Sequence, residues 1–182
     1  MRKLFFLCCL VAIVALSAAC DNSEGKTCRI IGVVPDSFME GQWVFLVPFS
    51  NATRANVDST VVKDGKFEFH TDTMMMAKLL TAFRLQLDVQ PLLVVVEPGD
   101  VEVTIASISS ARGTPQNDSL QHWKELTERH NSEMSAFRKT NDRVAADSAQ
   151  TVYTKRTRQL ADNLGQGVLY DFLNQILPKA KE

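Results

Sequence analysis

Two stretches of the chain have the apolar patterns of β-strands, and each stretch has a turn signal near its middle. In residues 57–71 apolar and polar side chains alternate on both sides of Asp64-Gly65, a dipeptide that suits a two-residue turn in which both residues take positive φ. Residues 92–96 form a continuous apolar run, and apolar residues alternate with polar ones over residues 101–105. Between them lies Pro98-Gly99, which suits a type II turn with glycine at the position of positive φ. The pattern predicts two β-hairpins.

Three further apolar runs lie between residues 28 and 89. Residues 28–34 are apolar and β-branched up to Pro35-Asp36, and residues 42–47 form a second run that Pro48 ends. Residues 79–89 are apolar enough for another strand, although residues 77–87 also fit a short helix. Several short strands at this spacing are typical of an antiparallel sandwich or a barrel-like sheet. We therefore expect an α+β fold that starts with a β-rich domain over residues 28–112.

The period of the pattern changes from two to about 3.6 after residue 112. Thr114 is a candidate N-cap and Pro115 suits the first helical position. Apolar or half-apolar residues then recur every three or four positions, at Leu120, Trp123, Leu126 or Thr127, His130, Met134 and Phe137. Residues 140–147 predict a break, residues 152–164 a second helix, and residues 168–177 a short apolar helix between Gly167 and Pro178. We expect residues 113–182 to form an α-helical segment.

The first twenty residues follow a secretory pattern. Arg2 and Lys3 precede an uncharged apolar run at residues 4–16, which is shorter than the ~20 residues that a helix needs to cross a bilayer. Residues 17–19 are small and lead directly to Cys20. This order predicts a signal peptide over residues 1–19.

A cysteine directly after the cleavage site also resembles the lipobox of bacterial lipoproteins. The resemblance implies that Cys20 carries a diacylglyceryl group and an acylated amino terminus, with residues 20–27 as a polar tether. Two or more acyl chains anchor a protein stably, whereas one does so only marginally. We expect a lipid-anchored protein of the bacterial cell envelope, attached to the outer membrane. The sequence does not say whether the protein faces the periplasm or the cell surface. The alternative is an ordinary secretory peptide that happens to be followed by cysteine.

Charge and cysteine content exclude two classes of protein. Removal of residues 1–19 takes Arg2 and Lys3 from the 20 basic residues and none from the 21 acidic ones, which leaves a net charge of −3. This balance argues against a nucleic-acid-binding protein, which would have a clustered basic face. No C-x-x-C pair is present, so a self-contained dithiol oxidoreductase is excluded. We expect Cys28 to be a buried strand residue in phase with Ile30, with intermolecular pairing as the alternative.

Several local motifs resemble, in their order and spacing, the N-terminal domain of unknown function 4369 (DUF4369). The matching pieces are Ile31-Gly32-Val33, residues 43–46, residues 57–60, residues 64–69, Glu97-Pro98-Gly99-Asp100 and residues 113–118, which together run through about residues 28–120. The resemblance implies a lipoprotein of Bacteroidota-type bacteria. In many relatives this domain and a helical segment precede a thioredoxin-like domain with thiol-disulfide activity. We expect this chain to lack that domain, so the thiol-disulfide activity of those relatives cannot be carried over to it.

Candidate catalytic and metal-binding residues are few. Asp64, Glu97 and Asp100 lie at turns, where a carboxylate pair could do acid–base work but where turn geometry already accounts for them. The three histidines, His70, His122 and His130, are too few and too far apart for a metal site. Residues 74–76, three consecutive methionines, offer soft ligands or, as we expect, core filling. We assign no catalytic, cofactor or metal site, and Cys20 as a lipidation site.

These observations lead to three functional hypotheses. The first is a lipid-anchored, non-catalytic binding module of unknown ligand that is attached to the membrane through Cys20. The second is an accessory domain that docks a separate thioredoxin-like oxidoreductase. The third is a structural role within an outer-membrane complex.

Overall fold

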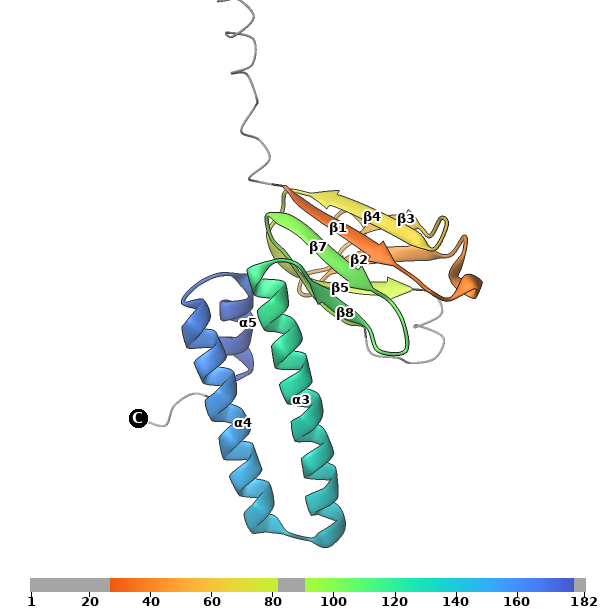
Figure 1. Cartoon of the computed structure of the whole chain (residues 1–182). Helices are drawn as coiled ribbons and strands as arrows, with labels where there is room; N and C mark the ends of the chain where they lie inside the picture. The colour runs from red at the N-terminus through yellow and green to blue at the C-terminus, as the bar shows by residue number, and fades with distance from the viewer. Residues whose placement is uncertain (1–26, 82–90, 179–182) are drawn as a thin grey trace, which may run out of the picture.

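The computed structural model describes residues 27–81 and 91–178, and these residues form two β-sheets followed by helices (Figure 1). The predicted signal peptide, Cys20 and most of the predicted tether lie outside the described residues. The first sheet has the strand order β4-β1-β7-β8 and the second has the order β3-β2-β5-β6. The expected α+β fold is confirmed as a β-sandwich with C-terminal helices, and the described strands close no barrel.

The bounds of the elements are as follows. The first sheet contains β1 (Cys28–Val33), β4 (Lys66–Thr71), β7 (Gly99–Thr104) and β8 (Ser110–Arg112). The second contains β2 (Trp43–Pro48), β3 (Asp58–Val61), β5 (Met75–Thr81) and β6 (Leu92–Val96). A short 3₁₀ helix, η3 (Ser37–Met39), precedes β2, and the α-helices are α3 (Pro115–Thr140), α4 (Arg143–Leu164) and α5 (Val168–Ile176).

The core between the sheets follows from the alternation of side chains along each strand. Cys28 and Ile30 are 2% and 0% exposed, which confirms the buried, in-phase position expected for the cysteine. Phe67 and Phe69 face the same core, with their ring centroids 5.9 Å apart. Gly32 lies opposite Phe67 in the β1–β4 register, and a Cβ at Gly32 would lie 2.0 Å from that ring. Glycine is therefore required there for the ring to cover the strand.

The two predicted hairpins are wrong as strand pairings. Asp64 and Gly65 do form a two-residue turn, with φ of 52° and 67°, but only Lys63 and Lys66 pair across it. Beyond this turn β3 joins β2 in the second sheet and β4 joins β1 in the first. β3 and β4 therefore pair with strands of different sheets, and this arrangement lets the apolar sides of the two sheets face each other in the common core.

The second predicted hairpin, over residues 92–105, is split in the same way. β6 pairs with β5, whereas β7 runs parallel to β1. Pro98 and Gly99 carry the chain from one sheet to the other across the end of the sandwich. The strand predicted over residues 79–89 is observed as β5, which begins four residues earlier at Met75; the part of the prediction beyond Thr81 lies outside the described residues.

The helices α3 and α4 form an antiparallel pair that projects from the sandwich, and α5 packs beside this pair (Figure 1). Thr114 and Pro115 occupy the predicted N-cap and first helical position of α3. The predicted break at 140–147 is only two residues long, because Asn141 takes a left-handed conformation and Asp142 caps α4 through a bond from the Ala145 N–H. A second core joins the outer face of the second sheet to the helices, through Met76, Val95, Leu120, Leu169 and Leu173. None of the described helices combines the length and the apolarity needed to span a membrane.

Candidate functional site

Glu97, which immediately follows β6, caps the amino terminus of α3. Its side chain is buried, and Oε1 accepts hydrogen bonds from the backbone N–H groups of Gln116 and Asn117 at 2.8 and 3.2 Å. Oε2 accepts a third bond from Gln116 Nε2 at 2.9 Å. The Thr114 side chain, the expected cap, makes no capping bond. A carboxylate at the positive end of the helix dipole takes its place.

Asn117 closes the free edge of β6. Its Oδ1 accepts from the Val95 N–H at 2.9 Å and its Nδ2 donates to the Val95 carbonyl at 2.7 Å, as a neighbouring strand would. Gln116 Oε1 accepts from the Leu169 N–H at 2.9 Å and so ties the start of α5 to the start of α3. These polar groups of the 97–100 and 113–118 motifs are therefore engaged in holding the sandwich to the helices, which leaves them poorly suited to act on a substrate.

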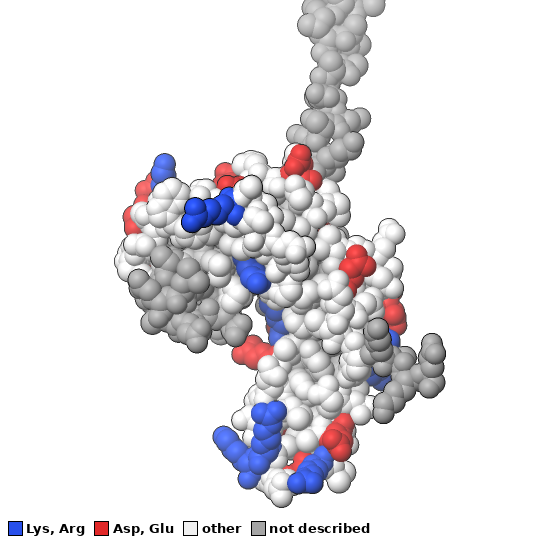
Figure 2. All heavy atoms as spheres, turned by 180° about the vertical axis from the view of Figure 1, so that it is seen from behind, with Lys and Arg blue, Asp and Glu red and all other residues white. Residues whose placement is uncertain are grey.

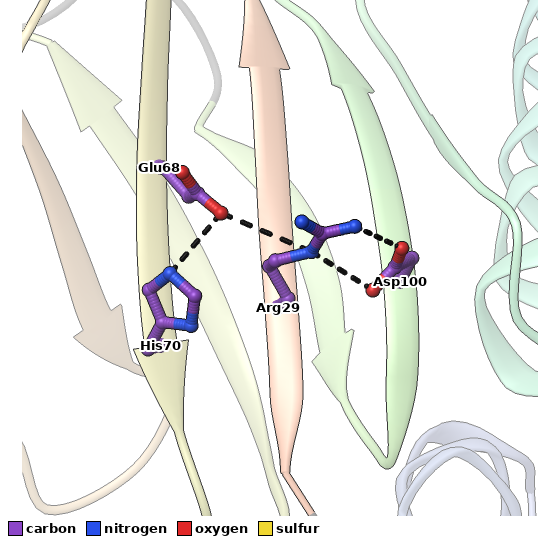
Figure 3. A network of polar contacts seen from close by, with 4 residues as sticks. All are labelled: Arg29, Glu68, His70 and Asp100. Atoms are coloured by element: carbon purple, nitrogen blue, oxygen red, sulfur yellow. Dashed lines mark hydrogen bonds and ion pairs between the residues drawn. The ribbon is translucent and has the colours of Figure 1, made fainter. Parts of the chain in front are cut away.

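Asp100 lies in a different place, on the outer face of the first sheet (Figure 3). Arg29 on β1 binds both of its carboxylate oxygens, with Nε 3.0 Å from Oδ1 and Nη2 in contact with Oδ2. The hydrogen bond from Arg29 lowers the pKa of the Asp100 carboxyl. On the other side of Arg29, Glu68 Oε1 lies 3.8 Å from Nε and 3.1 Å from His70 Nε2. Arg29, Glu68 and Asp100 are about half exposed and His70 is more exposed, so the four side chains form a row of polar contacts that water reaches.

The remaining candidate residues have structural positions. His122 is exposed on α3 and lines a hollow with residues of α4, whereas His130 is buried and stacks on Tyr153 at 4.4 Å between ring centroids. Among the described residues no group of three histidine, cysteine or carboxylate side chains could hold a metal ion. Met75 and Met76 pack against the two cores, as core filling predicts, whereas Met74 is exposed and fills no core. Burial raises the pKa of the Cys28 thiol and makes it a poor nucleophile.

A hollow of about 770 Å³ lies where the second sheet meets α3, and we call it the β6–α3 recess. Figure 2 shows lysine or arginine atoms in this region, between the sandwich and the helices. Its walls include Phe49, Lys78, Leu93, Trp123, Lys124 and Thr127. Pockets of this size, mostly apolar with a few converging polar groups, are typical of small-molecule sites.

Two half-buried lysines enter the β6–α3 recess from different elements. Lys124 on α3 donates from Nζ to the Leu93 carbonyl at 2.8 Å. Lys78 on β5 lies opposite Leu93 in the sheet register, and its Nζ lies 4.7 Å from the centroid of the Phe49 ring. Burial, with a smaller contribution from Arg112, lowers the pKa of Lys124 to about 8. Within the described part of the chain neither ammonium group forms an ion pair with a carboxylate.

Sequence reasoning missed this site, although one signal for it was present. Lys78 is a charged residue inside the apolar run of β5, where an aliphatic side chain would be expected. Lys124 carried no such signal, since a lysine next to Trp123 on an amphipathic helix is ordinary. Only the packing of α3 along β6 brings both lysines beside Leu93.

Comparison with known proteins gives one match. A protein-family model described as "Domain of unknown function (DUF4369)" matches residues 28–120. No curated protein and no solved structure matches the chain. The matched range covers the sandwich and the first turns of α3, and so contains both Glu97 and Asn117.

Proposed function

Because the chain belongs to the DUF4369 family, a domain of unknown function, we propose its function from its own residues. It is a lipid-anchored envelope lipoprotein, joined to the membrane through Cys20, whose folded part is a non-catalytic binding module. The leader supports the anchor, because small residues precede a cysteine directly after an apolar run. The structural role of Glu97 and Asn117 supports a module without catalysis.

One observation carries the binding role: two half-buried ammonium groups line a mostly apolar recess without a carboxylate partner among the described residues. Removing an ammonium group from water is costly unless an opposite charge compensates. A bound partner would supply that compensation. The β6–α3 recess is therefore the binding site that we assign to the module.

The arrangement of the elements suits a tethered protein. β1 begins at one end of the molecule, and the turn between α3 and α4 lies at the opposite end (Figure 1). A membrane anchor that precedes Cys28 would hold this helical pair away from the bilayer. The accessory role toward a separate thioredoxin-like enzyme stays a prediction, and the described residues add no observation in its favour.

The anchor is tested by growing cells with alkyne-labelled palmitate and separating membranes from soluble protein. We expect the unaltered chain and a Cys28→Ala control to take up the label and sediment with membranes. Cys20→Ser should lose the label and appear in the soluble fraction. A Cys20→Ser chain that stays labelled and sediments like the control would contradict the anchor.

The binding role is tested with a photo-crosslinking residue placed at Asn131, which lines the recess, or at Ser132, its exposed neighbour on α3. After irradiation of cells, mass spectrometry of the purified chain should find a defined adduct at position 131 and none at position 132. The chemical class of the adduct is immaterial to this test. Equal labelling, or no adduct at either position, would refute a binding site in the recess.

A further inference from the structure

The positive charge of the β6–α3 recess is held in place by the fold. One of the three N–H groups of the Lys124 ammonium donates to the Leu93 carbonyl. This bond fixes Nζ beside β6 and leaves two N–H groups for a ligand. Lys78 extends over the Phe49 ring from the neighbouring strand. Glu128, the acidic residue of the lining, is exposed. The described lining thus contains two half-buried cations and one exposed carboxylate.

The apolar walls of the recess are equally fixed. Phe49 and Trp123 both pack edge-on against Phe172, with ring centroids 5.2 and 5.6 Å apart. Leu93 and Trp123 rest on the second core between the sheet and the helices. Rigid aromatic walls that need no rearrangement lower the entropic cost of binding.

We infer that the β6–α3 recess binds an anion with an apolar body, of which an acyl carboxylate is the simplest form. Its anionic head would accept hydrogen bonds from Lys124 and Lys78, and its chain would lie against Phe49, Leu93 and Trp123. A charged head and an apolar body are both required, because the lining contains two lysines beside aromatic and aliphatic side chains. This inference rests on the proposed binding role and adds the class of ligand to it.

The test uses the water-extractable Cys20→Ser chain with Trp43→Phe, so that Trp123 is the remaining tryptophan and reports on the recess. The chain is titrated with decanoate, with decyltrimethylammonium, which carries an alkyl tail with the opposite charge, and with acetate. We expect saturable fluorescence change with decanoate, at least tenfold weaker binding of decyltrimethylammonium, and none of acetate. Equal affinities for the two charged amphiphiles, or no binding of decanoate, would overturn the inference.

Lysine variants locate the head group. Lys124→Gln and Lys78→Gln each retain a hydrogen-bond donor but lose the charge, and each should weaken decanoate binding by about tenfold, as expected for the loss of a charge-assisted bond. Lys155→Gln, at an exposed position of α4, is the matched control and should bind normally. Circular dichroism establishes that each variant is folded. An equal loss in Lys155→Gln, or normal binding in both recess variants, would refute the assigned contacts.

The two proposals can fail separately. If decanoate does not bind while the photo-crosslinking residue at position 131 still captures a defined molecule in cells, the anionic class is wrong and the binding site stands. If neither probe finds a ligand, both proposals are refuted.

Discussion

Asn117→Ala tests whether one side chain holds the open edge of the second sheet to the helices. Asn117 and Val95 are both 0% exposed, and the amide of Asn117 pairs with both backbone groups of Val95. Alanine removes these bonds together with the bond from Nδ2 to Thr114 Oγ1 at 2.8 Å. The Val95 N–H and carbonyl then lose the side-chain partner that they have among the described residues, at a buried position.

The expected loss can be worked from these contacts. A buried backbone group left without a partner costs about 1–3 kcal/mol, so two such groups cost about 4 kcal/mol. For a chain of this size that corresponds to a fall of roughly 8–16 °C in Tm. The measurement is equilibrium urea unfolding followed by far-UV circular dichroism, together with amide hydrogen exchange at Val95. Exchange at that amide should become faster than at the remaining amides of β6.

Asn131→Ala is the matched control, because Asn131 is an exposed asparagine on the same helix. We expect it to change the free energy of unfolding by less than about 0.5 kcal/mol, as surface substitutions usually do. The reasoning is refuted if Asn117→Ala also costs less than about 1 kcal/mol, or if the Val95 amide stays equally protected in that variant.

Three further predictions concern other parts of the fold. Glu97→Gln keeps the size of the helix cap but removes its charge from the positive end of the α3 dipole, so urea unfolding should show a loss of about 1 kcal/mol; an unchanged stability would contradict the cap. Gly32→Ala places a Cβ 2.0 Å from the Phe67 ring and should cost more than about 2 kcal/mol; adding Phe67→Leu should recover part of this loss, whereas simply additive losses would disprove the clash. Lys124 has a folded-state pKa of about 8 against an ordinary 10.5, so the unfolded chain binds more protons between these values. The stability of the unaltered chain relative to Lys124→Met should therefore rise from about pH 8 to about pH 10.5, and a flat difference in urea titrations would contradict burial of this ammonium group beside Arg112.

Local features of the fold were predictable because their causes lie within a few residues. The Asp64-Gly65 turn follows from two residues that tolerate positive φ, and the start of α3 follows from a fixed φ at Pro115. The burial of Cys28 follows from its phase with Ile30 on a strand. Strand partners were not predictable in this way, since alternation marks a strand that has one buried face but does not say which strand lies beside it.

The candidate site was still harder to predict. The sequence singled out Glu97 and Asp100 as neighbours at one turn, yet the structure buries Glu97 at a helix end and exposes Asp100 beside Arg29. Glu97 follows β6 of the second sheet, whereas Asp100 already lies on β7 in the first sheet, so the crossing at Pro98 and Gly99 separates them in space. Lys78 and Lys124 are 46 positions apart, and only the packing of α3 along β6 brings them to one recess.

The sequence by itself determined the strand and helix periods, most turns, the family match over residues 28–120 and the leader pattern that ends at Cys20. Each of these depends on the chemistry of neighbouring residues. Tertiary structure alone decided that the two turn-linked strand pairs divide between two sheets, that Asn117 completes the edge of β6, and that two lysines share an apolar hollow. Those outcomes depend on which surfaces can be buried together, and burial is a property of the whole packed chain rather than of any segment.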